Sequence, residues 1–206
     1  MTLTMTPQAI SATRATVGPV VGVGVGAVIC DEAGRVLLLR RGVQARNEQG
    51  MWACPGGALT VGESLQEAIV REVREECGLA IVVRCQLGAF DHLLPDGTQW
   101  VSIAYLAQVG DGGEPVVQEP GKCSACAWFV LDGLPEPLSP LAGMPLAAAC
   151  LLLASAAWQW KPAGSRDQFS ARGPGYREID RRLRVPMKSS RPSRSCQQKL
   201  LHLRFQ

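Results

Sequence analysis

Small and large apolar residues alternate at the start of the folded part of the chain. Residues 20–30 (VVGVGVGAVIC) alternate valine with glycine, and a second apolar run, residues 35–40 (RVLLLR), comes after the turn from Asp31 to Gly34. Alternation of this kind on both sides of a turn is typical of a β-hairpin. The glycines leave one face of the first strand without side chains, so that backbone or a ligand can approach it closely.

Helical periodicity begins after Ser64. Ser64 and Glu67 have the spacing of a capping box, and Gly78 is a typical helix stop. Four residues make the apolar stripe of this helix: Ile69, Val70, Val73 and Cys77. A short strand at Met51–Cys54 precedes the helix and ends in a turn, Pro55-Gly56-Gly57.

Further strands are predicted at residues 80–87, 90–94, 99–109 and 126–131, with Asp96-Gly97 as a hairpin turn before the third of them. An apolar helix is predicted at 145–160. Strands mixed with one central and one terminal helix predict the α/β class, with three layers around a mixed sheet.

The length of 206 residues suits one domain with additional sequence. We expect a loose N-terminal arm at 1–17, a folded domain at 18–160 and a basic, disordered tail at 161–206. Residues 1–160 hold 9 Lys and Arg against 15 Asp and Glu, whereas the tail holds 12 against 3. Basic tails can bind nucleic acid, but this one has no interleaved aromatic residues, which favours a solvated extension.

Cysteine spacing and hydropathy bear on the cellular compartment. The eight cysteines are irregularly spaced within apolar runs, which indicates reduced thiols and a cytoplasmic protein. Cys123 and Cys126 lack the second ligand pair of a zinc site, so we interpret them as structural rather than metal-binding or redox-active. Residues 141–160 carry no charge, but Pro145 and many alanines favour a buried or interface helix over a membrane span.

Carboxylates are concentrated between Gly57 and Leu79, where five glutamates occur in 23 residues. Glu72, Glu75 and Glu76 fall within one helical turn, where like charges repel each other. Glu75 and Glu76 also lie near the negative end of the helix dipole. A hard divalent cation such as Mg²⁺ offsets both costs, because it prefers carboxylate oxygens and bridges them to substrate phosphates.

The same stretch resembles the Nudix box, G-x5-E-x7-R-E-U-x-E-E-x-G-U, in which U is aliphatic. Every fixed position matches: Gly57, Glu63, Arg71, Glu72, Val73, Glu75, Glu76, Gly78 and Leu79. The resemblance covers about residues 18–160. The glycine-rich strand, the W-x-C-P-G-G run and residues 119–138 look like the MutT-type branch, which cleaves nucleoside triphosphates.

This resemblance implies a Nudix α/β/α sandwich that hydrolyses a substituted nucleoside diphosphate with Mg²⁺ or Mn²⁺. It implies that Glu72, Glu75 and Glu76 bind the metal, and that Glu75 or Glu76 also orients or deprotonates the attacking water. The Gly57 carbonyl would be a further ligand.

The remaining roles that the resemblance implies are supporting ones. Arg71 would hold the carboxylates by a salt bridge, Glu63 would support the loop or a second metal, and Gly56 would bring its backbone close to the substrate. The chain departs from the family after Lys122-Cys123, where relatives often carry a glutamate and this chain has Ser124. A tryptophan expected two residues later is Cys126, and Glu119 is a candidate substitute for the missing carboxylate.

The sequence gives less information about which residues select the substrate. By analogy, the glycine-rich strand, His92, Trp100 and Tyr105 would face the base, with Trp100 either stacking on it or packing in the core. The favoured hypothesis is a metal-dependent hydrolase that converts a canonical or oxidised nucleoside triphosphate to the monophosphate and pyrophosphate. The alternatives are a pyrophosphatase for ADP-ribose or dinucleoside polyphosphates, and a weakly catalytic regulator with a nucleic-acid-binding tail. A homodimer is left open, and no membrane partner is expected.

Overall fold

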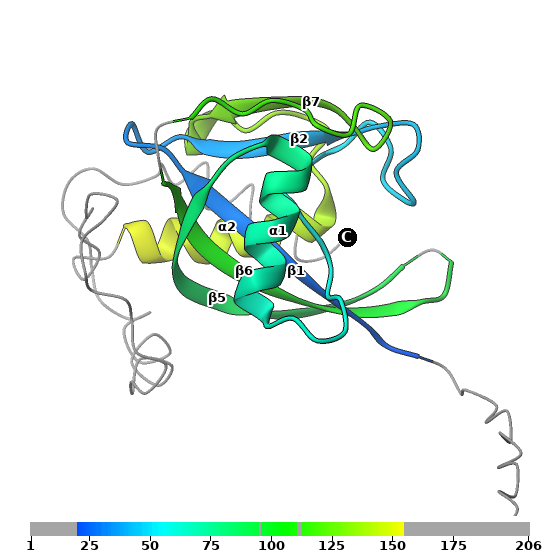
Figure 1. The fold of residues 1–206 in the computed structure, drawn as a ribbon. Helices are drawn as coiled ribbons and strands as arrows, with labels where there is room; N and C mark the ends of the chain where they lie inside the picture. Colours follow the sequence, from blue (N-terminus) through cyan, green and yellow to red (C-terminus); the bar gives the residue numbers. More distant parts are fainter. Residues whose placement is uncertain (1–19, 95, 111–112, 155–206) are drawn as a thin grey trace, which may run out of the picture.

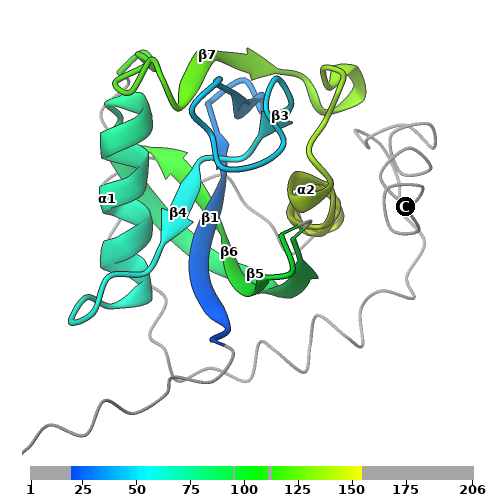
Figure 2. The same ribbon diagram turned by 90° about the vertical axis from the view of Figure 1, so that its right-hand side faces the viewer.

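Two helices cover opposite faces of a mixed β-sheet in the computed structural model, which describes residues 20–94, 96–110 and 113–154 (Figures 1 and 2). The helices are α1 (Leu65–Cys77) and α2 (Pro140–Leu153). The strands are β1 (Gly22–Cys30), β2 (Val36–Arg41), β3 (Trp52–Ala53), β4 (Gly56–Ala58), β5 (Ile81–Leu93), β6 (Gln99–Val109) and β7 (Cys123–Phe129), and a 3-10 helix, η1, spans Leu131–Gly133. The predicted arm and tail lie outside the described residues.

The sheet has the strand order β3-β2-β1-β6-β5, with β4 paired to β1 and β7 paired to β2. β1 and β6 run parallel from Gly22 opposite Trp100 to Cys30 opposite Gln108. The other strand pairs are antiparallel, and β1 and β2 meet at Cys30 and Val36. The expected α/β/α sandwich with a mixed sheet is therefore confirmed.

Alternation along the strands divides the core between the two helices. Val25, Ala27 and Ile29 of β1 share one buried cluster with residues of α1. Val28 and Cys30, which point to the other face, share a second cluster with residues of α2. Odd-numbered residues of β1 and β6 thus face α1, and even-numbered residues face α2.

α1 forms as its sequence predicts. The Ser64 hydroxyl accepts a hydrogen bond from the Glu67 amide, and the Glu67 carboxylate accepts one from the Ser64 amide, so the capping box is complete. Gly78 ends the helix in the left-handed conformation, with φ of 68°. Val70 is 37% exposed and does not belong to the buried stripe, which Ala68 joins instead.

Four predicted boundaries differ from the structure. Gly56 and Gly57 begin β4 instead of forming a turn, because their backbone pairs with β1. The two runs at 80–94 form one long strand, β5, with two register irregularities. β7 begins at Cys123 rather than at residue 126, and the 3-10 helix η1 replaces the end of the predicted strand.

The fourth difference concerns α2, which begins at Pro140 rather than at residue 145. Ser139 caps it by accepting a hydrogen bond from the Leu141 amide, and proline is favoured in the first turn of a helix. Pro145 therefore lies inside the helix instead of marking its start. Residues 155–160, the end of the predicted helix, lie outside the described part of the chain.

We expect Leu146→Ala to lower the free energy of unfolding by about 2–5 kcal/mol. Leu146 is fully buried between α2 and the sheet, so truncation removes apolar contacts and leaves a cavity. Urea unfolding checks this, with Leu151→Ala on the same helix as the matched control, because Leu151 is 41% exposed. A Leu146 variant no less stable than the Leu151 variant would contradict the packing of α2 described above.

Candidate active site

The two glycines of β4 allow α1 to lie directly against this strand. A Cβ on Gly57 would collide with the carboxylate of Glu72, and a Cβ on Gly56 would collide with the carbonyl of Val25 in β1. Gly56 also has a φ of 154°, a backbone conformation that residues other than glycine rarely adopt. The carboxylates of α1 therefore contact a bare stretch of backbone.

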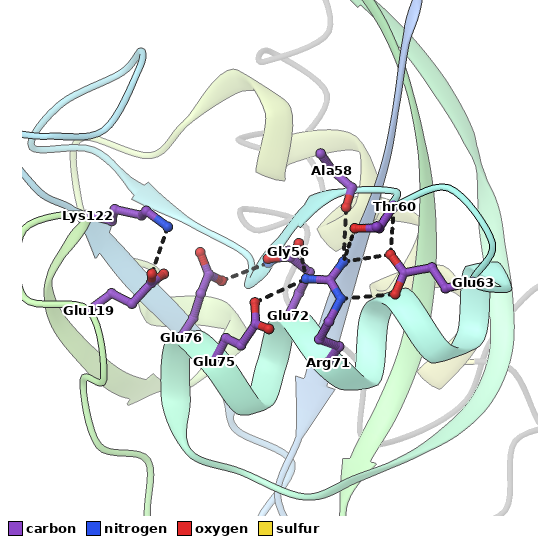
Figure 3. Close-up of polar contacts among 10 residues, drawn as sticks. All are labelled: Gly56, Ala58, Thr60, Glu63, Arg71, Glu72, Glu75, Glu76, Glu119 and Lys122. Atoms are coloured by element: carbon purple, nitrogen blue, oxygen red, sulfur yellow. Dashed lines mark hydrogen bonds and ion pairs between the residues drawn. The ribbon is translucent and has the colours of Figure 1, made fainter.

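Arg71 links the strand, the adjoining loop and the helix (Figure 3). Its Nε and Nη2 atoms donate to the two oxygens of Glu63 over 2.9 and 2.7 Å, and its Nη1 donates to Glu72 and Glu75 over 2.8 and 3.0 Å. Nη2 also donates to the Ala58 carbonyl over 3.1 Å. Arg71 thus forms ion pairs with Glu63, Glu72 and Glu75, and the supporting roles expected of Arg71 and Glu63 stay predictions.

The protonation of Glu63 and Arg71 is set by these contacts. Hydrogen bonds from Arg71, and then from the Thr60 amide, lower the pKa of Glu63 to about 2. The hydrogen bonds that Arg71 donates to Glu63, and then to Glu72, raise the pKa of Arg71 above its usual value. The pair is therefore fully charged at neutral pH.

Glu76 has a different environment. Its Oε2 accepts a hydrogen bond from the Gly56 amide over 2.9 Å, and the buried Cys123 thiol lies 4.0 Å from its Oε1. Desolvation of the carboxyl group raises its pKa to about 7, and the negative charges of Glu72 and Glu119 act in the same direction. Desolvation also raises the pKa of Glu72. Negative charge is thus costly at this end of the cluster.

The peptide groups of β4 alternate between β1 and α1. The Gly56 amide and the Ala58 carbonyl bond to Glu76 and Arg71, so both face the helix. The carbonyl oxygen of Gly57 lies beside β1, 3.0 Å from the position of a Cβ on Gly24. The backbone group adjacent to Glu76 is thus that of Gly56, and the role predicted for the Gly57 carbonyl stays a prediction.

The three predicted metal ligands lie together on one face of α1, but their carboxylates are engaged separately. Glu72 and Glu75 turn toward Arg71, and Glu76 turns toward Gly56 (Figure 3). Within residues 20–94, 96–110 and 113–154, no three His, Cys, Asp or Glu side chains are arranged to hold a metal ion. The donor set still suits a hard cation, because it offers carboxylate oxygens whose mutual repulsion and desolvation a positive charge would offset.

Glu119 lies next to this cluster, and Ser124 does not contact it. Glu119 forms an ion pair with Lys122 over 2.7 Å, and both residues lie beside Glu76 (Figure 3). Ser124 is exposed and donates to the Arg40 carbonyl over 3.3 Å. Cys126 packs against the core near α1. Glu119 is therefore geometrically reasonable as the source of negative charge that Ser124 does not supply, and its catalytic role stays a prediction.

The residues expected to face a base are divided between the two sides of the sheet. Tyr105 is 4% exposed and packs in the core under α1, so the expectation that it faces the substrate is wrong. Trp100 lies on the opposite face, where its ring covers Gly22. His92 is the cross-strand partner of Trp100, and its Nε2 lies 3.4 Å from the Ser102 hydroxyl. Trp100 does not contact the carboxylates.

Comparison with known proteins decides the family. Residues 20–147 match the family model of the NUDIX domain, which is more than half of the chain. The chain belongs to the Nudix family. All the carboxylates and glycines described above lie within the matched Nudix residues.

Individual relatives are similar over part of their length. The chain is 33% identical to the human 8-oxo-dGDP phosphatase NUDT18 over 114 residues, which are 54% of this chain and 33% of that protein. It is 32% identical to the ADP-ribose pyrophosphatase of Methanocaldococcus jannaschii over 111 residues, 52% of this chain and 62% of that protein. The chain thus spans less than two thirds of the length of these curated relatives.

A solved structure supports the fold more fully. The crystal structure of a MutT Nudix hydrolase from Burkholderia pseudomallei is 39% identical, with a TM-score of 0.56. The match covers 61% of this chain and 95% of that one. No helix among the described residues is long and apolar enough to cross a membrane.

The sequence did not predict several groups that contact the carboxylates and Arg71. The Thr60 amide, the Ala58 carbonyl and the Gly56 amide contribute through the main chain, which carries no residue signature. The sequence identifies Cys123 only as half of a cysteine pair, although its thiol contacts Glu76. The seven cysteines in the described part of the chain are free thiols, and burial raises the pKa of Cys123 to about 12.

Without divalent cations, we expect Glu76→Gln to stabilise the protein relative to wild type as the pH rises from 5 to 8. A carboxyl group whose pKa is about 7 when folded and 4.5 when unfolded favours folding only while it is protonated. Its favourable contribution is complete below pH 4.5 and is lost as the pH rises through 7. The difference between the two proteins should grow by about 1–3 kcal/mol over this range.

Urea unfolding in EDTA at pH 5, 6, 7 and 8 measures this difference. Glu75→Gln is the matched control, since the Glu75 side chain is 52% exposed and loses little hydration on folding. A difference between Glu76→Gln and wild type that stays constant with pH would show that the carboxyl group of Glu76 is not desolvated in the folded protein.

Proposed function

We propose that this Nudix protein hydrolyses nucleoside triphosphates, canonical or oxidised, to the monophosphate and pyrophosphate. The observation that supports this most directly is the arrangement of Glu72, Glu75 and Glu76 beside the two glycines of β4 and around Arg71. The similarity to a MutT Nudix hydrolase over 95% of that chain supports the same function.

The bare backbone of β4 suits a polyphosphate. Gly56 and Gly57 present no side chains, so a phosphate chain can approach the carboxylates without displacing protein atoms. Lys122, which pairs with Glu119 and whose pKa is raised chiefly by that pair, brings a positive charge to the same edge. Phosphate oxygens and carboxylates, however, repel each other strongly.

A divalent cation, Mg²⁺ or Mn²⁺, would resolve this repulsion. Glu72, Glu75 and Glu76 would hold it, together with a backbone oxygen of the β4 segment. When bound, it would neutralise the phosphate oxygens and increase the acidity of water. Arg71 bonds one oxygen of Glu72 and one of Glu75, so the second oxygen of each would be available as a ligand while the Arg71–Glu63 ion pair keeps the loop next to the helix.

The protein's own residues then serve a simple displacement. A water oxygen bonds to phosphorus, the phosphoanhydride bond breaks, and pyrophosphate leaves. Either Glu75 or Glu76 accepts the proton that the water loses. Glu76 is held in place by the Gly56 amide and the Cys123 thiol, whereas Glu75, which is more exposed, can reach solvent directly.

A second candidate function is pyrophosphatase activity on ADP-ribose or a dinucleoside polyphosphate. The similarity to an ADP-ribose pyrophosphatase supports it, and the same site would break the same kind of bond. A regulatory role with a nucleic-acid-binding tail stays a prediction, because residues 161–206 lie outside the described structure.

We expect Glu75→Gln and Glu76→Gln each to lower kcat by about 10²-fold or more, because each removes a charge and a proton acceptor from the reacting centre. Release of pyrophosphate or monophosphate is measured with Mg²⁺ on nucleoside triphosphates, ADP-ribose and dinucleoside polyphosphates. The wild type should lose activity in EDTA and regain it with Mg²⁺ or Mn²⁺.

Glu32→Gln serves as the matched control, because Glu32 is an exposed glutamate in the turn between β1 and β2. It should retain full activity. If the wild type releases no product from any of these substrates, or if both active-site variants turn over at the wild-type rate, the proposed function is wrong.

A further inference from the structure

The loop between β2 and β3 lies opposite the end of the β5–β6 hairpin. Arg46 of this loop forms an ion pair with Asp96 of the hairpin turn over 2.7 Å, although fifty residues separate them. Both segments extend toward the same side of the molecule (Figure 1). The two side chains are largely exposed, so this ion pair places residue 46 of loop 42–51 beside the hairpin turn but adds little stability.

Glu48 is held in this loop in an unusual conformation. It has a φ of 51°, and it is the one non-glycine residue with positive φ in the described part of the chain. Its Oε2 accepts a hydrogen bond from Ser139, the buried N-cap of α2. Its Oε1 makes no hydrogen bond to any described residue. Strain of this kind persists where the surrounding structure imposes it, and it is concentrated at functional sites.

The contact with Ser139 places Glu48 on the α2 side of the sheet. Trp100 and Ser102 of β6 point to this side, because they alternate with Val101 and Ile103, which pack under α1. His92 is paired with Trp100 across the strands and lies 3.4 Å from Ser102. The negative charge of Glu48 also acts electrostatically on His92, in the direction that raises the pKa of the imidazole.

Trp100 provides an aromatic surface here. Its ring lies across Gly22, where a Cβ would collide with three ring atoms, and it is only partly buried. Burial lowers the pKa of His92, so its imidazole is neutral at pH 7 and offers one donor and one acceptor. An aromatic ring, a free carboxylate oxygen, an imidazole and a hydroxyl thus lie on one sheet face, opposite the face that α1 covers.

We propose that Glu48 selects the substrate by accepting hydrogen bonds from the N–H groups of an aromatic base stacked on Trp100. A carboxylate only accepts hydrogen bonds, so it favours a base edge with adjacent donors, such as the N1–H and the 2-amino group of guanine. Adenine presents a ring acceptor where guanine presents N1–H, and it is disfavoured. The proposal rests on the proposed function for its role in hydrolysis, but base recognition itself requires no turnover.

The aromatic surface and the carboxylates border neighbouring glycines. The ring of Trp100 lies 3.6 Å from the Cβ position of Gly24, the Gly57 carbonyl lies 3.0 Å from that position, and the Glu72 carboxylate borders the Cβ position of Gly57. The paired backbone of β1 and β4 lies between the two faces, so the phosphates of a base on Trp100 would reach the carboxylates around the end of this backbone and not through it.

Calorimetric titration with GMP, IMP and AMP tests this without catalysis. The wild type should bind GMP most tightly, IMP, which lacks the 2-amino group, less tightly, and AMP least tightly. Glu48→Gln should weaken GMP binding about tenfold and leave AMP binding nearly unchanged, since a neutral amide satisfies one donor at most. Asp91→Asn is the matched control, because Asp91 also acts on His92 but lies on the other face of β5.

Glu48→Gly is the second variant. Glycine suits a φ of 51°, so it removes the carboxylate without straining the backbone, and the folded variant should lose the GMP preference. Its melting temperature should fall somewhat, because the buried Ser139 hydroxyl loses its acceptor. Equal affinity of wild type for GMP and AMP, or an equal change for both in Glu48→Gln, would overturn the proposal. If GMP preference depends on Glu48 but no triphosphate is hydrolysed, the selection site stands and the proposed function falls.

Discussion

The contact between α1 and β4 is the constraint on which the site depends. Because Gly56 and Gly57 lack side chains, a helix surface carrying three glutamates can lie against backbone rather than against packed side chains. The alternation of β4 then directs the Gly56 amide and the Ala58 carbonyl toward the helix, where they meet Glu76 and Arg71. A single Cβ at either glycine would push the carboxylates away from the strand.

This contact concentrates negative charge, and the protein compensates for it unevenly. Arg71 neutralises one end of the cluster through Glu63, Glu72 and Glu75, and the low pKa of Glu63 reflects that pairing. The other end receives the Gly56 amide and a thiol, with the charges of Arg41 and Lys122 farther off, and desolvation still raises the pKa of Glu76 to about 7. A cation would therefore stabilise the Glu76 end, where burial makes the negative charge costly.

The sequence predicts features whose determinants are local. The capping box at Ser64, the stop at Gly78, and the grouping of Glu72, Glu75 and Glu76 on α1 depend on spacing along one segment, and the structure reproduces them. Features that depend on pairing between distant segments are not predicted. Gly56 and Gly57 form a strand because β1 is available to pair with them, and α2 starts early because Ser139 and Pro140 supply its first turn.

The same distinction applies to the residues that were expected to face a substrate. Tyr105 and Trp100 both lie in β6, and the sequence offers no means of deciding which face of the sheet each would occupy until the partners of β6 are known. In the observed pairing, odd-numbered positions of β6 face α1, so Tyr105 is buried there. Even-numbered positions face the other side, so the ring of Trp100 lies against the glycines of β1. Glu48 carries no motif at all, because its importance derives from a contact with Ser139 ninety-one residues away.

In the two proposals, the sheet separates two tasks. Residues of β4 and α1 meet on one side, where charge density would suit phosphate chemistry, while the ring of Trp100 and the carboxylate of Glu48 on the other side would hold a base. Substitutions on the α2 side can therefore change which nucleotide is bound without disturbing Arg71 and the carboxylates, so that selection can vary while the reacting centre stays intact.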